Sequence, residues 1–233
     1  MAAGLALVAT AASIAPSEAV PRRIILLRHG EKANATSLCS VGQQRAIALR
    51  DTYLGRNASN NSLLEGQTPA AFLAITVHTE ETSTPSATSW GLPVRSFGVI
   101  PINAGNEQLM AGLARATQAA AADVLQNPLW ENRTVVMTWE HKHIANKGIE
   151  RQNAGTNVTL RQLLNLDRIA GVPAKWPGTN YDYFWIIDYA DQNSAIPTSF
   201  EMVKQTYPAP FNTLPHNDWN TPLPSNFPSS CLR

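Results

Sequence analysis

Arg28 and His29 are the residues whose types and position first indicate chemistry, since they follow four consecutive aliphatic residues at 24–27. Such an unbroken apolar run is typical of a strand buried on both faces, and Gly30 allows the chain to turn sharply after it. In open α/β sheets, ligands bind at the carboxyl ends of the strands. We therefore predict an active site at this strand end, although a single histidine in such a position more often caps a neighbouring backbone group.

Two more histidines follow apolar runs later in the sequence. Residues 70–77 lead into His78, and a second run at 134–139 is soon followed by His141. Both runs are expected to be buried strands whose polar ends reach the same kind of sheet edge. The occurrence of His141 at a second strand end, together with Arg28, favours a shared functional site over isolated capping contacts.

The elements that position these residues follow from the spacing of apolar side chains. Intervals of three and four predict a helix over 38–54 with Ser40 as its N-cap, and the alanine-rich stretch 107–125 predicts a second helix. Shorter elements are expected as helices at 82–90, 144–149 and 160–166, and as strands at 97–100 and 181–189. The last of these, rich in aromatic residues, is expected to be the final strand of the sheet.

Length and composition favour one globular domain. The chain has 233 residues, of which 44% are apolar and 15% are charged, which is enough for one core and short for two domains. We place the domain at 21–206. A tail rich in proline and asparagine follows at 207–233, and we expect it to lie over the body or to be partly disordered.

Residues 1–20 resemble a secretory signal peptide. They are apolar and alanine-rich, and residues 17–19 offer a small-x-small cleavage site, although no lysine or arginine precedes Arg22. We therefore expect a secreted or periplasmic protein; the alternative is a disordered or helical N-terminus on a cytoplasmic protein. Cys39 and Cys231 either form a disulfide in an oxidising compartment or remain free thiols.

The charge balance excludes strongly electrostatic partners. The formal net charge of +1, from 18 basic and 17 acidic residues, gives no electrostatic footprint for nucleic acid or an anionic membrane. We therefore expect no nucleic-acid partner, and no membrane partner once a signal peptide is removed. Any phosphate group that the protein binds must be held by a local pocket. The sequence leaves the oligomeric state open.

The motif residues resemble those of the histidine phosphatase superfamily, also called phosphoglycerate-mutase-like, over residues 22–205. The first part of the motif is a buried strand followed by the triplet Arg28, His29 and Gly30, and the later positions that match are Leu38, Gly42, Arg45, Ala46, Trp139, Glu140 and His141. The resemblance implies an α/β fold: a single-domain three-layer α/β/α sandwich with a mostly parallel central sheet.

The resemblance also implies roles for the candidate residues. In that family the histidine of the triplet is the nucleophile and forms a phosphohistidine, which is the role implied for His29. Arg28 is expected to grip the phosphoryl oxygens with its planar fork of donors, and His141 to contact the same oxygens. No metal or other cofactor is implied. The implied substrate is a small phosphomonoester, whose identity the sequence does not specify.

His78 marks a departure from the family, because it stands where members normally carry a second phosphate-binding arginine. No arginine lies between Arg56 and Arg95. A histidine carries a full positive charge only below its pKa, which is about 6.5 when unperturbed. We therefore expect weaker phosphate affinity or an activity optimum on the acidic side.

The general acid is open at this stage. The family branch without an acidic residue after the second histidine uses a later glutamate, and Glu107 lies at a suitable distance from His78. Glu107 is equally suited to be a favourable acidic residue in the first turn of its helix. The competing carboxylates are Glu80, Glu81 and Glu140.

The remaining charged residues and histidines near the motif have simpler interpretations. We expect Arg45 to form a salt bridge or to pack against the body, and the same interpretation applies to Glu31 and Lys32. His143 is expected to be a neighbour of the site without a chemical role. His216, in the proline-rich tail, is expected at the surface.

The sequence as a whole predicts a metal-independent phosphatase that hydrolyses a small phosphomonoester through a phosphohistidine on His29. One alternative is a non-catalytic phospho-ligand-binding or scaffold protein of the same fold, since the second arginine is replaced by His78. A less favoured alternative is a phosphomutase, because the sequence lacks the long helical insertion seen in mutases.

Overall fold

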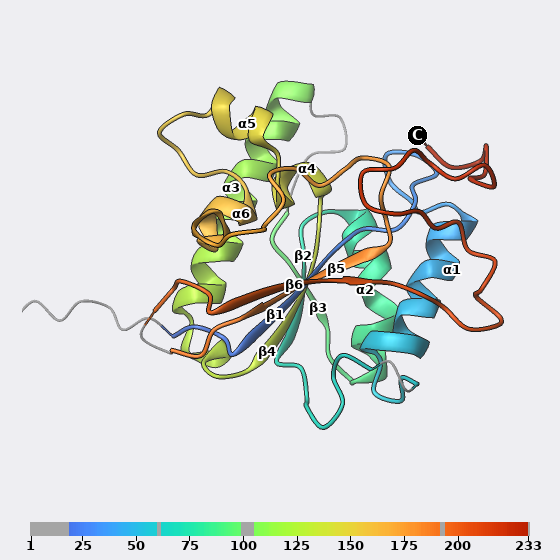
Figure 1. Ribbon diagram of the computed structural model, residues 1–233, viewed down its shortest axis with the longest axis horizontal. Coiled ribbons are helices and arrows are strands. Elements are labelled where there is room, and N and C mark those ends of the chain that lie inside the picture. The colour runs from blue at the N-terminus through green and yellow to red at the C-terminus, as the bar shows by residue number, and fades with distance from the viewer. Residues whose placement is uncertain (1–18, 60–61, 99–104, 192–193, 233) are drawn as a thin grey trace, which may run out of the picture.

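A single mixed sheet forms the centre of the protein (Figure 1). The computed structural model describes residues 19–59, 62–98, 105–191 and 194–232. The strands are β1 (Arg23–Arg28), β2 (Ala71–Ala74), β3 (Val94–Ser96), β4 (Thr134–Trp139), β5 (Tyr183–Asp188) and β6 (Ser199–Lys204). Their spatial order is β3-β2-β4-β1-β5-β6. The pairs β2–β3, β2–β4 and β1–β4 are parallel, and β5 is antiparallel to both neighbours, which confirms the predicted mostly parallel sheet.

Helices cover both faces of the sheet and complete the predicted three-layer α/β/α sandwich (Figure 1). One face carries α1 (Ser40–Leu49), which continues as a π-helical turn (Arg50–Leu54), and α2 (Val77–Ser89). The opposite layer contains α3 (Asn106–Gln126), α4 (His141–Ile144), α5 (Lys147–Gln152) and α6 (Leu160–Leu163). Short 3-10 turns occupy Pro128–Trp130 and Leu166–Arg168.

The central strand β1 supplies side chains to two cores, one on each face of the sheet. Ile24 and Leu26 pack into the core beneath α3, whereas Ile25 and Leu27 pack into the core beneath α1. All four are almost fully buried, as predicted from the unbroken apolar run. Burial of each such side chain contributes about 1.5–3 kcal/mol, so this strand fixes the position of whatever follows it.

The second predicted strand is shorter than expected, and the helix after it begins earlier. β2 ends at Ala74, and α2 begins at Val77 rather than at residue 82. The cause is the local hydrogen bonding of two threonines, because the backbone N–H of Thr76 donates to Oγ1 of Thr79 at 2.8 Å. This turn starts the helix inside the apolar run. His78 therefore lies in the first turn of α2 and not at a strand end.

Two further strand predictions were wrong. The strand expected at 97–100 lies at β3, over Val94–Ser96, and residues 99–100 are outside the described part of the chain. β5 is not the final strand, because β6 adds to its free edge in antiparallel register. β6 was missed because its mixture of polar and apolar residues is typical of a half-exposed edge strand and gives a weak signal.

The predicted helices agree better with the structure than the predicted strands do. The helix predicted at 107–125 is confirmed as α3, whereas the segment 144–149 is divided between α4 and α5, and 160–166 between α6 and a 3-10 turn. The N-cap of α1 is Cys39 instead of Ser40. Cys39 is held in an extended conformation at that point, because its N–H donates to the carbonyl of Glu31 at 2.9 Å.

The tail lies over the body, fastened by a disulfide between Cys39 and Cys231. The N–H of Leu232 donates to the carbonyl of Lys32 at 2.7 Å, so the tail also pairs with the loop that follows β1. Residues 1–18, most of the segment expected to be a signal peptide, are outside the described part. Within the described ranges, no helix is both long and apolar enough to cross a membrane.

Candidate active site

The candidate site lies where β1 and β4 end side by side. The register pairs Arg28 with Trp139, so the next residues on the two strands, His29 and Glu140, emerge next to each other. The N–H of His29 donates to the carbonyl of Trp139 at 3.3 Å and extends the pairing by one step. The prediction that the residues after these two strands meet at one sheet edge is therefore confirmed.

Gly42 allows the start of α1 to approach the turn after His29. A Cβ at this position would lie 2.2 Å from the carbonyl oxygen of Glu31, a separation that real side chains do not reach. A glycine is therefore required there, and helix α1 packs directly on the turn that carries the histidine.

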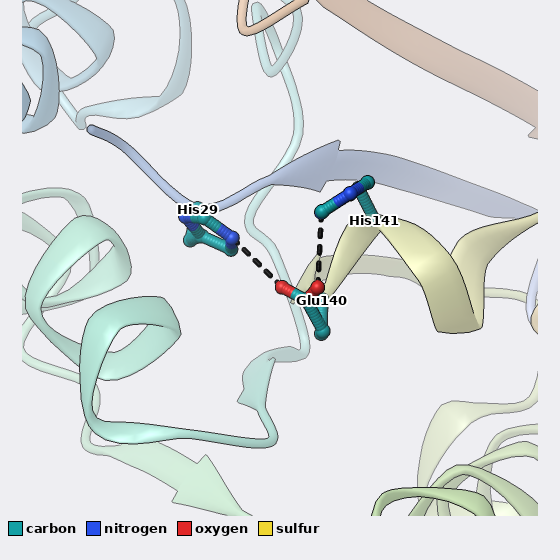
Figure 2. Close-up of side chains that lie close together, drawn as sticks. All are labelled: His29, Glu140 and His141. Atoms are coloured by element: carbon teal, nitrogen blue, oxygen red, sulfur yellow. Dashed lines mark hydrogen bonds and ion pairs between the residues drawn. The ribbon is translucent and has the colours of Figure 1, made fainter. Parts of the chain in front are cut away.

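Glu140 lies between two histidine rings, as Figure 2 shows. Its Oε2 is 2.8 Å from Nε2 of His29, and its Oε1 is 2.9 Å from Nδ1 of His141. The other ring nitrogen of His29, Nδ1, is 2.7 Å from the carbonyl oxygen of Gly30. Each ring nitrogen of His29 thus lies within hydrogen-bond distance of an acceptor oxygen. A neutral ring has one N–H and can donate to only one of them.

The two tautomers of neutral His29 have different consequences. With the proton on Nε2, the ring donates to Glu140 and the site is at rest. With the proton on Nδ1, the ring donates to Gly30, and the lone pair of Nε2 is free to attack an electrophile. In this second form the lone pair faces the carboxylate of Glu140, so Glu140 must turn away or carry a proton.

Burial and the contacts of Glu140 with the two histidines act in opposite directions on the protonation of these groups. It lowers the pKa of His29 to about 3, because the charged ring would be removed from water; the bond to Glu140 opposes this shift without cancelling it. Burial would raise the pKa of Glu140, but the contacts with His141 and His29 outweigh it and hold that pKa well below its ordinary range. Burial also lowers the pKa of His141, and the charge of Arg28 adds to this shift.

Arg28 is fixed by several contacts, but one of its donors has no partner among the described residues. Its Nη1 donates to the backbone carbonyls of Gly178 at 2.6 Å and Asn180 at 3.0 Å, and its guanidinium stacks 3.8 Å from the ring centre of Tyr181. The Nε–H of Arg28 is buried with no partner among the described residues. A buried charged donor without a partner is costly, so this edge is suited to bind an incoming anion.

His78 and Lys32 complete the ring of basic groups. The ring of His78 is centred 6.0 Å from that of His29, and Nζ of Lys32 lies 3.6 Å from Oε2 of Glu140. His78 is only partly free, because its Nε2 is 2.9 Å from the carbonyl oxygen of Asn34. Burial lowers its pKa, with a smaller contribution from Lys32, so it adds no fixed positive charge at neutral pH.

The structure brings four predicted residues together and leaves the fifth apart. The rings of His78 and His141 are centred 6.0 Å and 6.2 Å from that of His29, and the charge of Arg28 acts on His141. Glu107, in contrast, is exposed in the first turn of α3 with no described contact to them. Glu140, named in the sequence analysis only as a competitor, takes the central position. The sequence did contain a signal for its presence in the site, because Glu140 stands directly between a buried strand and His141.

Glu31 and Arg45 have the structural role predicted for them. Nη2 of Arg45 donates to Glu31 at 2.6 Å, and its Nη1 donates to Asp182 at 2.7 Å, with all three side chains buried. Paired buried charges of this kind are stable only as a complete set. The network joins the turn after His29 to the segment before β5. Lys32, in contrast, belongs to the site.

His29, Glu140 and His141 also form a possible metal-binding group, with one ligand atom from each lying within 4.8 Å of the others. Two imidazoles and a carboxylate suit several divalent transition metals. The charges of Arg28 and Lys32, however, border the same atoms and favour an anion at this position.

A cavity of about 410 Å³ adjoins the group and is lined on one side by Glu140, His78 and Lys32. His143 also lines it, is almost fully buried, and has no partner for either ring nitrogen within the described structure. His143 is therefore next to the site, as predicted. His216 is exposed in the tail, also as predicted.

Comparison with known proteins found that this chain is similar to solved structures only. No family model and no curated protein sequence matched. The mycobacterial glucosyl-3-phosphoglycerate phosphatase is 16% identical over 79% of this chain and 98% of its own, with a TM-score of 0.41. A structure called mycobacterial hydrolase 1 is 17% identical over 79% of this chain and 97% of its own, with a TM-score of 0.44. Similarity at this level does not assign an activity, and the function is argued below from the residues of this chain.

Proposed function

We propose that this protein is a metal-independent phosphatase that hydrolyses a small phosphomonoester through a phosphohistidine on His29. The observation that carries the proposal is the buried ring of His29, whose Nδ1 faces the carbonyl of Gly30 at 2.7 Å and whose Nε2 points at Glu140. A proton on Nδ1, held by that carbonyl, directs the lone pair of Nε2 toward a bound phosphoryl group.

The proposed reaction has two steps. In the first, Nε2 of His29 attacks phosphorus, the bond between phosphorus and the ester oxygen breaks, and protonated Glu140 gives its proton to the leaving alkoxide. In the second, Glu140 takes a proton from water, the water oxygen attacks phosphorus, and the bond to Nε2 breaks to release inorganic phosphate. Both steps require Glu140 to be displaced from its contact with Nε2 of His29, because phosphorus must take that position.

Arg28 and His141 are proposed to hold the phosphoryl oxygens. The unpartnered Nε–H of Arg28 is a charged donor in a buried setting, where its bond to an anion is strong. His141 lies on the other side of Glu140, with its ring centred 6.2 Å from that of His29. We assign the acid to Glu140 and not to Glu107, because Glu140 contacts both histidines, whereas Glu107 is exposed and has no described contact with them.

The test is direct detection of the covalent intermediate. Wild-type protein incubated with ³²P-labelled phenyl phosphate and quenched in alkali should carry label that is stable in alkali and lost in acid. His29→Gln should carry none, and His216→Gln, which changes an exposed histidine of the tail, should be labelled like the wild type. Hydrolysis that continues in His29→Gln, without any label on the wild type, would overturn the proposal.

A second candidate is a phospho-ligand-binding protein without turnover. It is favoured by the position of Glu140, 2.8 Å from Nε2 of His29, where a phosphorus atom would have to lie, and by the absence of an arginine at position 78. In that case inorganic phosphate binds but no label forms, and Glu140→Gln binds phosphate more tightly. A phosphomutase is distinguished by transfer of the label to a second hydroxyl of the substrate instead of to water.

We also propose that the protein works in an oxidising compartment. The disulfide between Cys39 and Cys231 supports this, because such bonds persist mainly in secreted and periplasmic proteins. The resemblance of residues 1–20 to a signal peptide points the same way. Recovery of the protein outside the cytoplasm, with its N-terminus cut near residue 20, is the expected result.

A further inference from the structure

The cavity beside Glu140 lies in the direction that a leaving group must take. In phosphoryl transfer the attacking and leaving atoms are roughly in line on opposite sides of phosphorus. Nε2 of His29 points at Oε2 of Glu140, 2.8 Å away, and Glu140 lines the cavity. An ester attacked by His29 therefore has its alcohol part in this cavity.

The space around Arg28 is already occupied by protein groups. Nη1 of Arg28 is bonded to carbonyl groups of the 177–180 segment, and the ring of Tyr181 lies against its guanidinium. That ring is centred 6.3 Å from the ring of His29. Within the described part of the chain, the cavity beside Glu140 is thus a space that can receive the rest of a substrate.

The lining of the cavity combines polar and apolar side chains. Lys32, His78 and Glu140 belong to its polar part, and further polar lining residues are Asn34, Thr36, Thr76, Glu80, Asn106, Lys142 and His143. Its apolar part includes Ile75, just after β2, and Leu109, Met110 and Leu113 of α3. These three residues of α3 recur at helical spacing and present a continuous apolar surface.

We propose that this cavity selects phosphomonoesters of aromatic or bulky aliphatic alcohols over those of small polar alcohols. The inference rests on the proposed function. An apolar alcohol part gains by leaving water for the surface of Leu109 and Met110. A small polar alcohol such as glycerol has no apolar part to cover this surface, so it gains none of this stabilisation. A volume of about 410 Å³ is sufficient for a body of one or two rings.

The first experiment compares esters of primary alcohols, so that leaving-group acidity does not favour the aromatic substrate. We expect kcat/KM for 2-(1-naphthyl)ethyl phosphate to exceed that for glycerol 3-phosphate at least about tenfold. Ethyl phosphate, which has neither rings nor extra hydroxyls, should fall between them. Equal values for the three esters, or a preference for glycerol 3-phosphate, would overturn the inference.

Variants of the apolar wall give the second experiment. Leu109→Asn and Met110→Gln should raise KM for the naphthyl ester about tenfold with little change in kcat, and leave glycerol 3-phosphate unaffected. Both residues are half-buried, so the variants are expected to fold. The matched control is Leu129→Asn, which changes an exposed leucine of the 3-10 turn. A loss that is equal for both esters would contradict a role in selectivity.

Binding of a non-hydrolysable analogue separates this inference from the proposed function. Calorimetry with 2-(1-naphthyl)ethylphosphonate and methylphosphonate needs no turnover. If no ester is hydrolysed and no label forms, the proposed phosphatase activity fails, but tighter binding of the naphthyl compound that is lost in Leu109→Asn still supports the cavity assignment. Equal binding of both phosphonates would overturn it even in an active enzyme.

Discussion

The carboxylate oxygen Oε2 of Glu140 lies 2.8 Å from Nε2 of His29, at the point that a phosphorus atom must occupy for attack by that nitrogen. Glu140 and a substrate therefore compete for the same position in the free site. A buried carboxylate that is displaced by the phosphoryl group ends next to the leaving oxygen, where an acid is needed. In the free protein, the contact thus blocks Nε2 of His29. In the proposed reaction, the same contact keeps Glu140 close to the position where its proton is needed.

Replacement of Glu140 tests this arrangement. Glu140→Gln keeps the shape but removes the proton donor, and we expect kcat for an alkyl phosphate to fall by about 10²- to 10⁴-fold. The matched control is Glu107→Gln, which changes the exposed carboxylate of α3 and should leave kcat within about twofold. The reverse pattern, with Glu107→Gln inactive and Glu140→Gln active, would assign the acid to Glu107.

The pH dependence follows from the pair His29 and Glu140. In the proposed reaction, the reactive form has a protonated Glu140 and a neutral His29. It therefore carries one proton more than the form in which His29 is neutral and Glu140 is a carboxylate. Because the pKa of His29 is lowered to about 3 and that of Glu140 is also lowered, this proton is lost as pH rises. We expect kcat to fall about tenfold per pH unit between about pH 5 and pH 8. A maximum at pH 8 would contradict this.

An arginine at position 78 should strengthen phosphate binding. His78 is neutral at pH 7 because burial lowers its pKa, and its Nε2 is engaged by the carbonyl of Asn34. His78→Arg adds a fixed charge, and we expect the inhibition constant of inorganic phosphate to fall about tenfold at pH 7.5. His78→Gln is the uncharged control. An unchanged constant in His78→Arg would show that this position does not face the anion.

His143 should make the protein sensitive to acid. Burial lowers its pKa to about 4, whereas the unfolded chain has a value of about 6.5. Its contribution to stability is complete above pH 6.5 and is lost as pH falls toward 4. His143→Leu removes this dependence and two unpaired nitrogens, so we expect about 1–2 kcal/mol higher free energy of unfolding at pH 7 and a larger gain at pH 5. Urea denaturation at both pH values, with His216→Leu as the control, measures it.

Chelation tests whether His29, Glu140 and His141 bind a metal. Since Arg28 and Lys32 border the three ligand atoms, we expect turnover to survive dialysis against EDTA without loss. Added Zn²⁺ should inhibit, because it would occupy the nitrogen needed for attack. Activity that is lost on dialysis and restored by Zn²⁺ would instead identify a metal centre.

The convergence of Arg28, His29 and His141 was predictable because it follows from buried strands, whose apolar runs are readable and whose ends share one edge. The position of Glu140 between the two histidine rings was not predictable, since it depends on side-chain directions at the strand end. The start of α2 was missed because two threonines, not an apolar pattern, fix it. The pairing of Cys39 with Cys231 joins positions 192 residues apart, which no local signal encodes.

Residues of the C-terminal tail contact the site, so the site is complete only after the tail has been synthesised. Phe227 stacks on Tyr181, which in turn lies against Arg28, and Leu232 pairs with the backbone of Lys32. During translation, β1 emerges with Arg28 and His29 long before these partners exist. A growing chain therefore lacks these contacts of the site until synthesis has passed Cys231, which lies 192 residues beyond Cys39.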